Sequence, residues 1–261
     1  MLIISTLNNY NIPKIQTFVT SLKESGYKGQ KCMIVYKCEE SVKTYLKKFG
    51  WNIIEKDLEG EDRFIVHKRF QHYAEVINNN YNSNRVTSVS RVLVTDCRDV
   101  YFHQNPETLN IVDLYIGQDG HFPQGGPEPS ENNNHWAAKE ILKEYPDYFE
   151  FLKDKFHLNA GVFYGSTDTV VSLCKKVYDL AFESKLYDKN NKLYWKHTAV
   201  DQLALNIVAY RDFQYKNEFN NSIINLQQTF WNTDIFFVIY HQYDRIEHFW
   251  DKLKEKNKKI F

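Results

Sequence analysis

Two aspartates follow an apolar segment near the middle of the chain. Val92–Val94 runs through Thr95 into Asp96 and Asp99. Aspartate is unfavourable inside strands, so an acid pair directly after a predicted strand needs an explanation. Carboxylate oxygens are preferred ligands of Mg²⁺ and Mn²⁺, which complete their shells with phosphate oxygens and water. The pair therefore predicts a divalent metal site, and the alternative is a turn aspartate with a surface ion pair to Arg98.

A histidine and an arginine follow the last apolar run. His241 comes just after the predicted strand Phe236–Tyr240, where an imidazole nitrogen could supply a third metal ligand. Arg245 could hold a diphosphate through two parallel hydrogen bonds. The alternatives are a structural or surface histidine and an ion pair of Arg245 with Asp244 or Glu247.

Two further segments place polar residues beside predicted core elements. Asn159 precedes Ala160 and Gly161, whose small side chains let a ligand approach the backbone, and the amide could bind sugar hydroxyls. Asp201 lies where an apolar helix is predicted to begin and could act as a general base or stabilise charge at a reacting carbon. A tight turn at Asn159 and a helix cap at Thr198 or Asp201 are equally simple interpretations.

The elements that must position these residues alternate between strand and helix. Predicted strands are Leu2–Thr6, Cys32–Tyr36, Trp51–Ile54, Arg91–Thr95, Leu114–Ile116, Gly161–Tyr164 and Phe236–Tyr240. Predicted helices are Pro13–Gly26, Val42–Phe49, Arg63–Ile77, His135–Glu144, Asp168–Glu183 and Ala199–Ala209. This alternation is typical of one α/β domain, here residues 1–261, with a mostly parallel central sheet flanked by helices. Ligands of such sheets bind beyond the carboxyl ends of the strands, which directs attention to the residues after Thr6, Thr95 and Ile116.

Polar residues outside these motifs leave two questions open. Residues 117–134 are rich in glycine, proline, asparagine and acids, which fits either a lid over a substrate or a floppy insertion. Asp119 in this segment is an alternative catalytic base. Arg63, Lys68 and Arg69 lie on a predicted helix, and either they reach phosphates or they are simply exposed.

Composition excludes several classes of protein. The 261 residues, 43% hydrophobic and 25% charged, are typical of a globular protein with a sizeable core. The formal charge of +0 provides no overall attraction to nucleic acid. No apolar run approaches the roughly 18 residues of a membrane span, and no signal peptide is evident. With four cysteines outside any zinc spacing, we expect a cytoplasmic protein, or one whose anchor lies outside this sequence.

The ordered set of motifs resembles that of the GT-A glycosyltransferases. Its Asp-x-x-Asp spacing is similar to that of the glycosyltransferase domain of procollagen lysyl hydroxylase/glucosyltransferase enzymes and related viral and bacterial families. The resemblance extends from Leu2 to about Arg245 as motifs. It implies a Rossmann-like GT-A fold in which Asp96, Asp99 and His241 bind Mn²⁺ or Mg²⁺.

The same resemblance implies roles for the remaining motifs. Asn159 and Asp201 would face the donor sugar, and the loop with Thr6 and Asn8 would face the nucleoside. One departure is that Cys97 stands where the commoner Asp-x-Asp spacing has its first acid, so Asp96 must substitute for it. The implied activity is transfer of a hexose from a nucleotide sugar, such as a UDP-sugar, to a hydroxyl acceptor on a glycan, protein or small molecule.

Two alternatives to this function stay open. A carbohydrate-binding protein could keep the fold without turnover, and the 16% aromatic residues would suit stacking on sugars, although most belong to a core. A sugar nucleotidyltransferase has a similar sheet, but it usually carries a glycine-rich basic loop after the first strand. Leu7-Asn8-Asn9-Tyr10 stands at that position, which disfavours this class.

Overall fold

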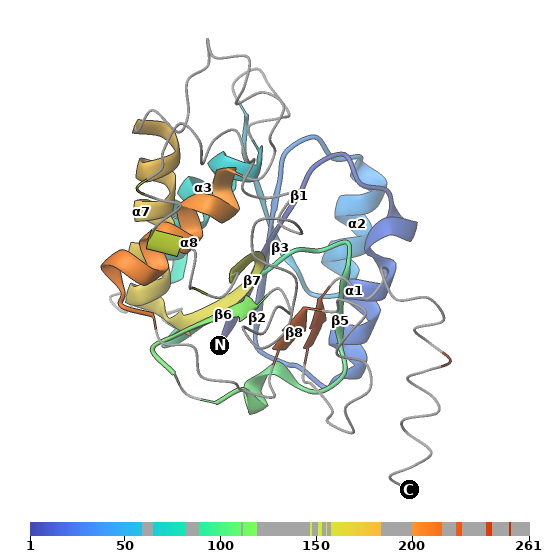
Figure 1. Cartoon of the computed structure of the whole chain (residues 1–261). Helices are drawn as coiled ribbons and strands as arrows, with labels where there is room; N and C mark the ends of the chain where they lie inside the picture. Colours follow the sequence, from blue (N-terminus) through green and yellow to red (C-terminus); the bar gives the residue numbers. More distant parts are fainter. Residues whose placement is uncertain are drawn as a thin grey trace, which may run out of the picture.

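A six-stranded sheet forms the centre of the molecule (Figure 1). The structure is a computed structural model that describes residues 1–58, 65–81, 89–110, 112–118, 147, 151–152, 155, 158–183, 200–215, 223–225, 239–241 and 251. The strand order is β3-β2-β1-β4-β7-β6. The strands are β1 (Leu2–Leu7), β2 (Gln30–Val35), β3 (Asn52–Glu55), β4 (Arg91–Thr95), β6 (Leu114–Gln118) and β7 (Leu158–Ser166).

The strand directions define the fold class. β1 pairs in parallel with β2 and β4, and β2 pairs in parallel with β3. β7 is antiparallel to both of its neighbours, β4 and β6. The sheet is thus mixed but largely parallel, and the predicted α/β, Rossmann-like class is confirmed.

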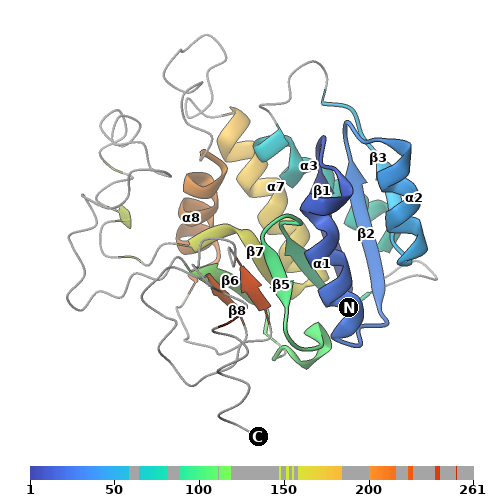
Figure 2. The same cartoon turned by 90° about the vertical axis from the view of Figure 1, so that its right-hand side faces the viewer.

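Helices cover both faces of this sheet. They are α1 (Ile12–Glu24), α2 (Glu40–Lys48), α3 (Ile65–Tyr81), α7 (Thr167–Glu183) and α8 (Val200–Asp212), with a 3₁₀ turn η2 (Pro106–Thr108). α1 and α2 lie on one face, and α3, α7 and α8 lie on the other (Figures 1 and 2). Side chains alternate along each strand. Leu2 and Ile4 accordingly pack toward α3, α7 and α8, whereas Ile3 and Leu7 pack toward α1 and α2.

The topological switch point lies between β1 and β4. β2 and β4 lie on opposite sides of β1. In folds of this kind, such a reversal of strand order opens a ligand-binding crevice at the carboxyl ends of the strands. Two side chains join these ends: Ser5 Oγ donates to Thr95 O at 2.5 Å, and Cys97 Sγ donates to Thr6 O at 3.1 Å. Asp96, the first residue after β4, is therefore fixed at the switch point.

A second, three-stranded sheet carries residues from the end of the chain to this point. Its order is β5 (Val100–Phe102), β9 (Ile239–His241) and β8 (Ile223–Asn225). β5 and β9 are antiparallel, with Val100 opposite His241. Phe102 N donates to Ser21 Oγ of α1 at 3.1 Å, and Figure 2 shows β5 beside α1. β5 thereby joins the late strand β9 to the first half of the fold.

Several predicted boundaries differ from the structure. His241 lies within β9 and not after a strand, because the ladder with β5 extends through it. Asn159 lies inside β7, which begins at Leu158 because its pairing with β6 reaches Gln118. The predicted helix 135–144, the predicted strand residues 236–238 and residues 119–134 lie outside the described residues. Among the described helices, none has the length and apolar character that crossing a bilayer would require.

Candidate metal centre

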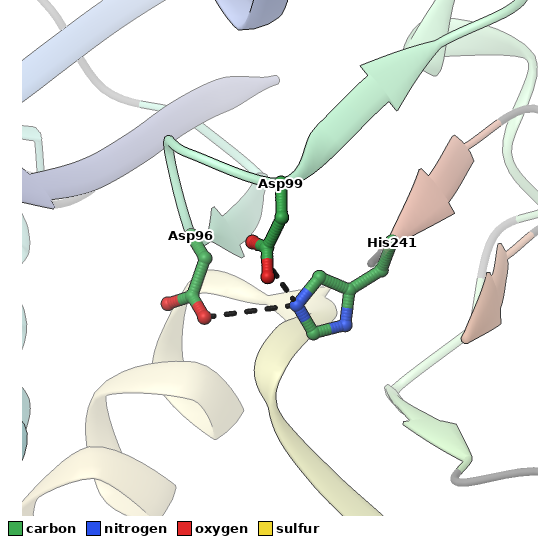
Figure 3. Close-up of side chains that lie close together, drawn as sticks. All are labelled: Asp96, Asp99 and His241. Atoms are coloured by element: carbon green, nitrogen blue, oxygen red, sulfur yellow. Dashed lines mark ion pairs between the residues drawn. The ribbon is translucent and has the colours of Figure 1, made fainter. Parts of the chain in front are cut away.

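Asp96, Asp99 and His241 converge at the switch point (Figure 3). Each offers one ligand atom, and these atoms all lie within 4.8 Å of one another. His241 Nε2 is 3.6 Å from Asp96 Oδ2 and 3.6 Å from Asp99 Oδ1. His241 and Asp99 are buried, whereas Asp96 keeps 33% of its side chain exposed. One side of the cluster is therefore open to a ligand.

Local structure explains this convergence. Asp96 follows the buried strand β4, and Asp99 immediately precedes β5. The residues between them turn the chain from the large sheet into the small one, so both carboxylates face the same space. Because Val100 pairs with His241 across β5 and β9, the imidazole lies next to Asp99.

The donor set fits a divalent cation. Separations of 3.6 Å are longer than hydrogen bonds, so each carboxylate faces the imidazole without bonding to it. Ligand atoms bound about 2.1 Å from one small divalent ion lie roughly 3–4 Å apart. Two carboxylate oxygens and one imidazole nitrogen suit several divalent metals. The three residues could therefore hold a metal ion, and the donor set alone does not choose which.

Gly161 brings the backbone of β7 against this cluster. Asp96 N donates to Gly161 O at 2.7 Å, which extends the β4–β7 ladder past the end of β4. A Cβ atom at Gly161 would overlap the His241 ring and lie 2.8 Å from Asp96 Oδ2. The absence of a side chain is thus a requirement for placing the imidazole beside the carboxylate.

Arg69 of α3 joins Asp96, and through it the cluster of three side chains, to Asp201 of α8. Its two terminal nitrogens donate to Asp96 Oδ1 at 2.7 Å and to Asp201 Oδ2 at 2.8 Å. Only 11% of the Arg69 side chain is exposed. Burial alone would lower the pKa of Arg69, but Asp96 and Asp201 raise the pKa above its ordinary value. The guanidinium therefore stays charged between the two acids.

The two acids bound to Arg69 respond to it differently. Burial would raise the pKa of Asp96, but Arg69 and His241 outweigh this effect and hold that pKa below its ordinary value. Burial raises the pKa of Asp201, and Arg69 only partly offsets this effect. Asp96 is consequently a ready anionic ligand, whereas the charge on Asp201 depends on its partner.

Asp99 faces a second arginine. Arg98 Nη2 lies 3.6 Å from Asp99 Oδ2, and 51% of the Arg98 side chain is exposed. Tyr10, half-buried in the loop after β1, has its pKa raised by burial and by nearby acids including Asp96 and Asp99. A half-exposed arginine thus lies beside Asp99, and a tyrosine lies near both acids.

The other predicted site residues occupy separate places. Thr6 Oγ1 shares a 3.1 Å hydrogen bond with Tyr73 OH, and Asn8 Oδ1 accepts from Lys37 N at 3.4 Å. Asn159 is buried, and its Oδ1 accepts from Gly161 N at 2.7 Å. Thr6 of β1, Asn8 of the loop after β1 and Asn159 of β7 thus lie outside the cluster of three. Arg245, Asp119 and Arg63 lie outside the described residues.

Sequence reasoning missed the bridging role of Arg69. Neither interpretation of it, a phosphate ligand or an exposed charge, anticipated two carboxylate partners, the half-exposed Asp96 and the buried Asp201. A signal existed, because Arg69 lies four residues before Tyr73 and eight before Ile77 on the buried face of α3. An arginine on such a face needs buried partners, although the pattern does not say which ones.

No protein-family model matches the chain, and no curated protein matches it significantly. What the protein does must therefore be argued from the site.

Proposed function

We propose that this protein is a metal-dependent glycosyltransferase that moves a hexose from a nucleotide sugar, a UDP-sugar in the simplest case, to a hydroxyl acceptor. The observation that carries the proposal is the convergence of Asp96, Asp99 and His241 at the switch point of a Rossmann-like sheet. Nucleotides bind at such switch points, and divalent ions bridge their phosphates.

The three converging residues would hold Mn²⁺ or Mg²⁺. Such an ion, when bound, neutralises the charge that develops on a nucleoside diphosphate leaving group. The protein contributes a fixed ligand set, because β4, β5 and β9 hold all three side chains before any ligand arrives. Preorganised charge of this kind is the largest contribution to many enzymatic rate enhancements.

The balance of charge at the site supports an anionic ligand. Three carboxylates and two guanidinium groups leave one net negative charge. A divalent cation would change the sign of the site, and a diphosphate would then be attracted to it. Half-exposed Arg98 could contact the diphosphate directly, as could Arg245 from outside the described residues.

Asp201 is the candidate for contact with the sugar. It is buried in the first turn of α8, and one of its oxygens already binds Arg69. Because Arg69 already occupies that oxygen, the carboxylate is better suited to stabilising charge at the anomeric carbon than to removing a proton. Asn159 would complete the sugar side, and Thr6 and Asn8 would lie nearest the nucleoside.

Calorimetric titration with UDP tests this function. UDP should bind in the presence of Mn²⁺, not in chelator, and not to Asp99→Ala. A panel of UDP-hexoses should then reveal one donor from which the protein releases UDP when an acceptor is present.

The matched control is Asp113→Asn. Asp113 is remote from the cluster and accepts hydrogen bonds from Ser166 and Thr169, so this variant should bind UDP as the parent does. Equal UDP binding by Asp99→Ala would contradict the proposal, and sugar binding in chelator without turnover would indicate a carbohydrate-binding protein.

A further inference from the structure

Arg69 is placed to hold one rotation of the Asp96 carboxylate. Asp96 Oδ1 binds the guanidinium at 2.7 Å, and Asp96 Oδ2 faces His241 at 3.6 Å. One oxygen is thus held away from the proposed metal and the other is directed toward it. Groups that bind the outer oxygen of a metal-binding carboxylate orient it and tune its affinity for the ion.

The same guanidinium is held by Asp201. Arg69 Nη2 donates to Asp201 Oδ2 at 2.8 Å and to Ala160 O at 3.4 Å. Arg69, Asp96 and Asp201 therefore form one chain of charge-assisted hydrogen bonds from α8 through α3 to the end of β4. Planar guanidinium can bind two acids at fixed angles, whereas an ammonium group is a single point charge.

We propose that Arg69 is a positioning residue that couples the charge of Asp201 to the affinity of Asp96 for the metal. When Asp201 is neutralised, Arg69 loses one of its two anchors, its charge is balanced by Asp96 alone, and Asp96 becomes a poorer metal ligand. The inference rests on the proposed function in taking Asp96 as a ligand. The new element is that metal binding and ligand binding at Asp201 affect each other, because coupling between two sites is reciprocal.

A double-mutant cycle on metal affinity tests this relay. Mn²⁺ alone is titrated into the parent, Asp201→Asn, Arg69→Lys and the double variant. In the parent background Asp201→Asn should weaken Mn²⁺ binding about 10-fold, as is usual for an outer-shell partner. Arg69→Lys keeps the charge but cannot bond to both acids at once in the same geometry. In this background, Asp201→Asn should have less than about a third of that effect. Arg69→Met with and without Asp201→Asn provides a second background that lacks the charge.

Two controls separate the relay from general damage. Asp212→Asn removes an acid from the other end of the same helix, where Asp212 pairs with Lys176 and Arg211, and it should leave Mn²⁺ affinity unchanged. Thermal unfolding in chelator checks that each variant is folded.

The outcomes are distinct from those of the proposed function. An equal effect of Asp201→Asn in every background would overturn the relay, because Asp201 would then act directly through its charge, while UDP binding and turnover could still stand. If Asp201→Asn has the smaller effect expected in the Arg69 variants but the protein never binds UDP, the relay is supported and the glycosyltransferase proposal is contradicted. Absence of Mn²⁺ binding in the parent would overturn both.

Discussion

Asp96 and Asp99 each direct one oxygen toward His241, but their other oxygens face very different arginines. The partner of Asp96 is Arg69, which is 11% exposed and shared with Asp201. The partner of Asp99 is Arg98, which is 51% exposed and 3.6 Å away. Buried charges must be paired, whereas exposed ion pairs contribute little to stability. Arg69 is therefore part of the folded framework, whereas the exposed guanidinium of Arg98 is available to a ligand.

The largest contrast should appear in stability. Arg69→Met leaves Asp96 and Asp201 without their common partner and should lower the free energy of unfolding by about 3–5 kcal/mol. Arg98→Met should change it by less than about 1 kcal/mol. Urea unfolding in chelator measures both. Equal losses of unfolding free energy in the two variants would contradict the distinction between the two arginines. Partial recovery of that free energy when Asp201→Asn is added to Arg69→Met would support it further.

Neutralising each acid should affect metal affinity similarly but stability differently. Asp96→Asn and Asp99→Asn should each weaken Mn²⁺ binding at least about 100-fold, more than loss of a typical outer-shell partner. In chelator, Asp96→Asn should also destabilise the fold by about 1.5–3 kcal/mol, because Arg69 loses a charged acceptor. Asp99→Asn should be close to neutral. Calorimetry and urea unfolding test the pair, and unchanged Mn²⁺ binding by either variant would contradict its role as a ligand.

Two glycines of β7 separate packing at the metal centre from packing elsewhere. A methyl group at Gly161 would overlap His241, whereas one at Gly165 would overlap the backbone carbonyl of Asp113. Gly161→Ala and Gly165→Ala should each cost about 1–3 kcal/mol of stability through overpacking. Only Gly161→Ala should weaken Mn²⁺ binding, by about 10-fold, because it displaces a ligand. A matching loss of affinity in Gly165→Ala would mean that the metal centre responds to general damage.

The smallest expected effect concerns the exposed arginine. Arg98→Met should weaken UDP binding in Mn²⁺ by about 3- to 5-fold at low salt, since an exposed charge contributes up to about 1 kcal/mol. The difference from the parent should shrink at high salt, where such charges are screened. Calorimetry at two salt concentrations measures it. A loss that does not change with salt would assign Arg98 to the folded framework instead.

The parallel part of the sheet could be predicted because each element there has a local signal. β1, β2, β3 and β4 are short apolar runs separated by amphipathic helices, and Asp96 directly follows the last of them. An acid pair at a strand end has few structural explanations. Its position at the switch point follows from topology alone.

The remaining features depend on contacts between distant residues. β5 and β9 are three-residue strands about 140 positions apart, and only their pairing places His241 beside Asp99. The antiparallel direction of β7 has no signal of its own, so the position of Gly161 against Asp96 could not be predicted. The partners of Arg69 lie on two other elements, and a single sequence does not identify them.

The most direct test asks whether the late histidine binds the same metal as the early acids. Pulsed electron paramagnetic resonance detects a nitrogen nucleus coordinated to Mn²⁺ as a modulation of the spin echo. The protein loaded with one Mn²⁺ should show this modulation, His241→Gln should lose it, and His103→Gln, which changes a ring beside Tyr240, should keep it. Bound Mn²⁺ without nitrogen modulation in the parent, or modulation that persists in His241→Gln, would show that Asp96, Asp99 and His241 do not form the metal centre.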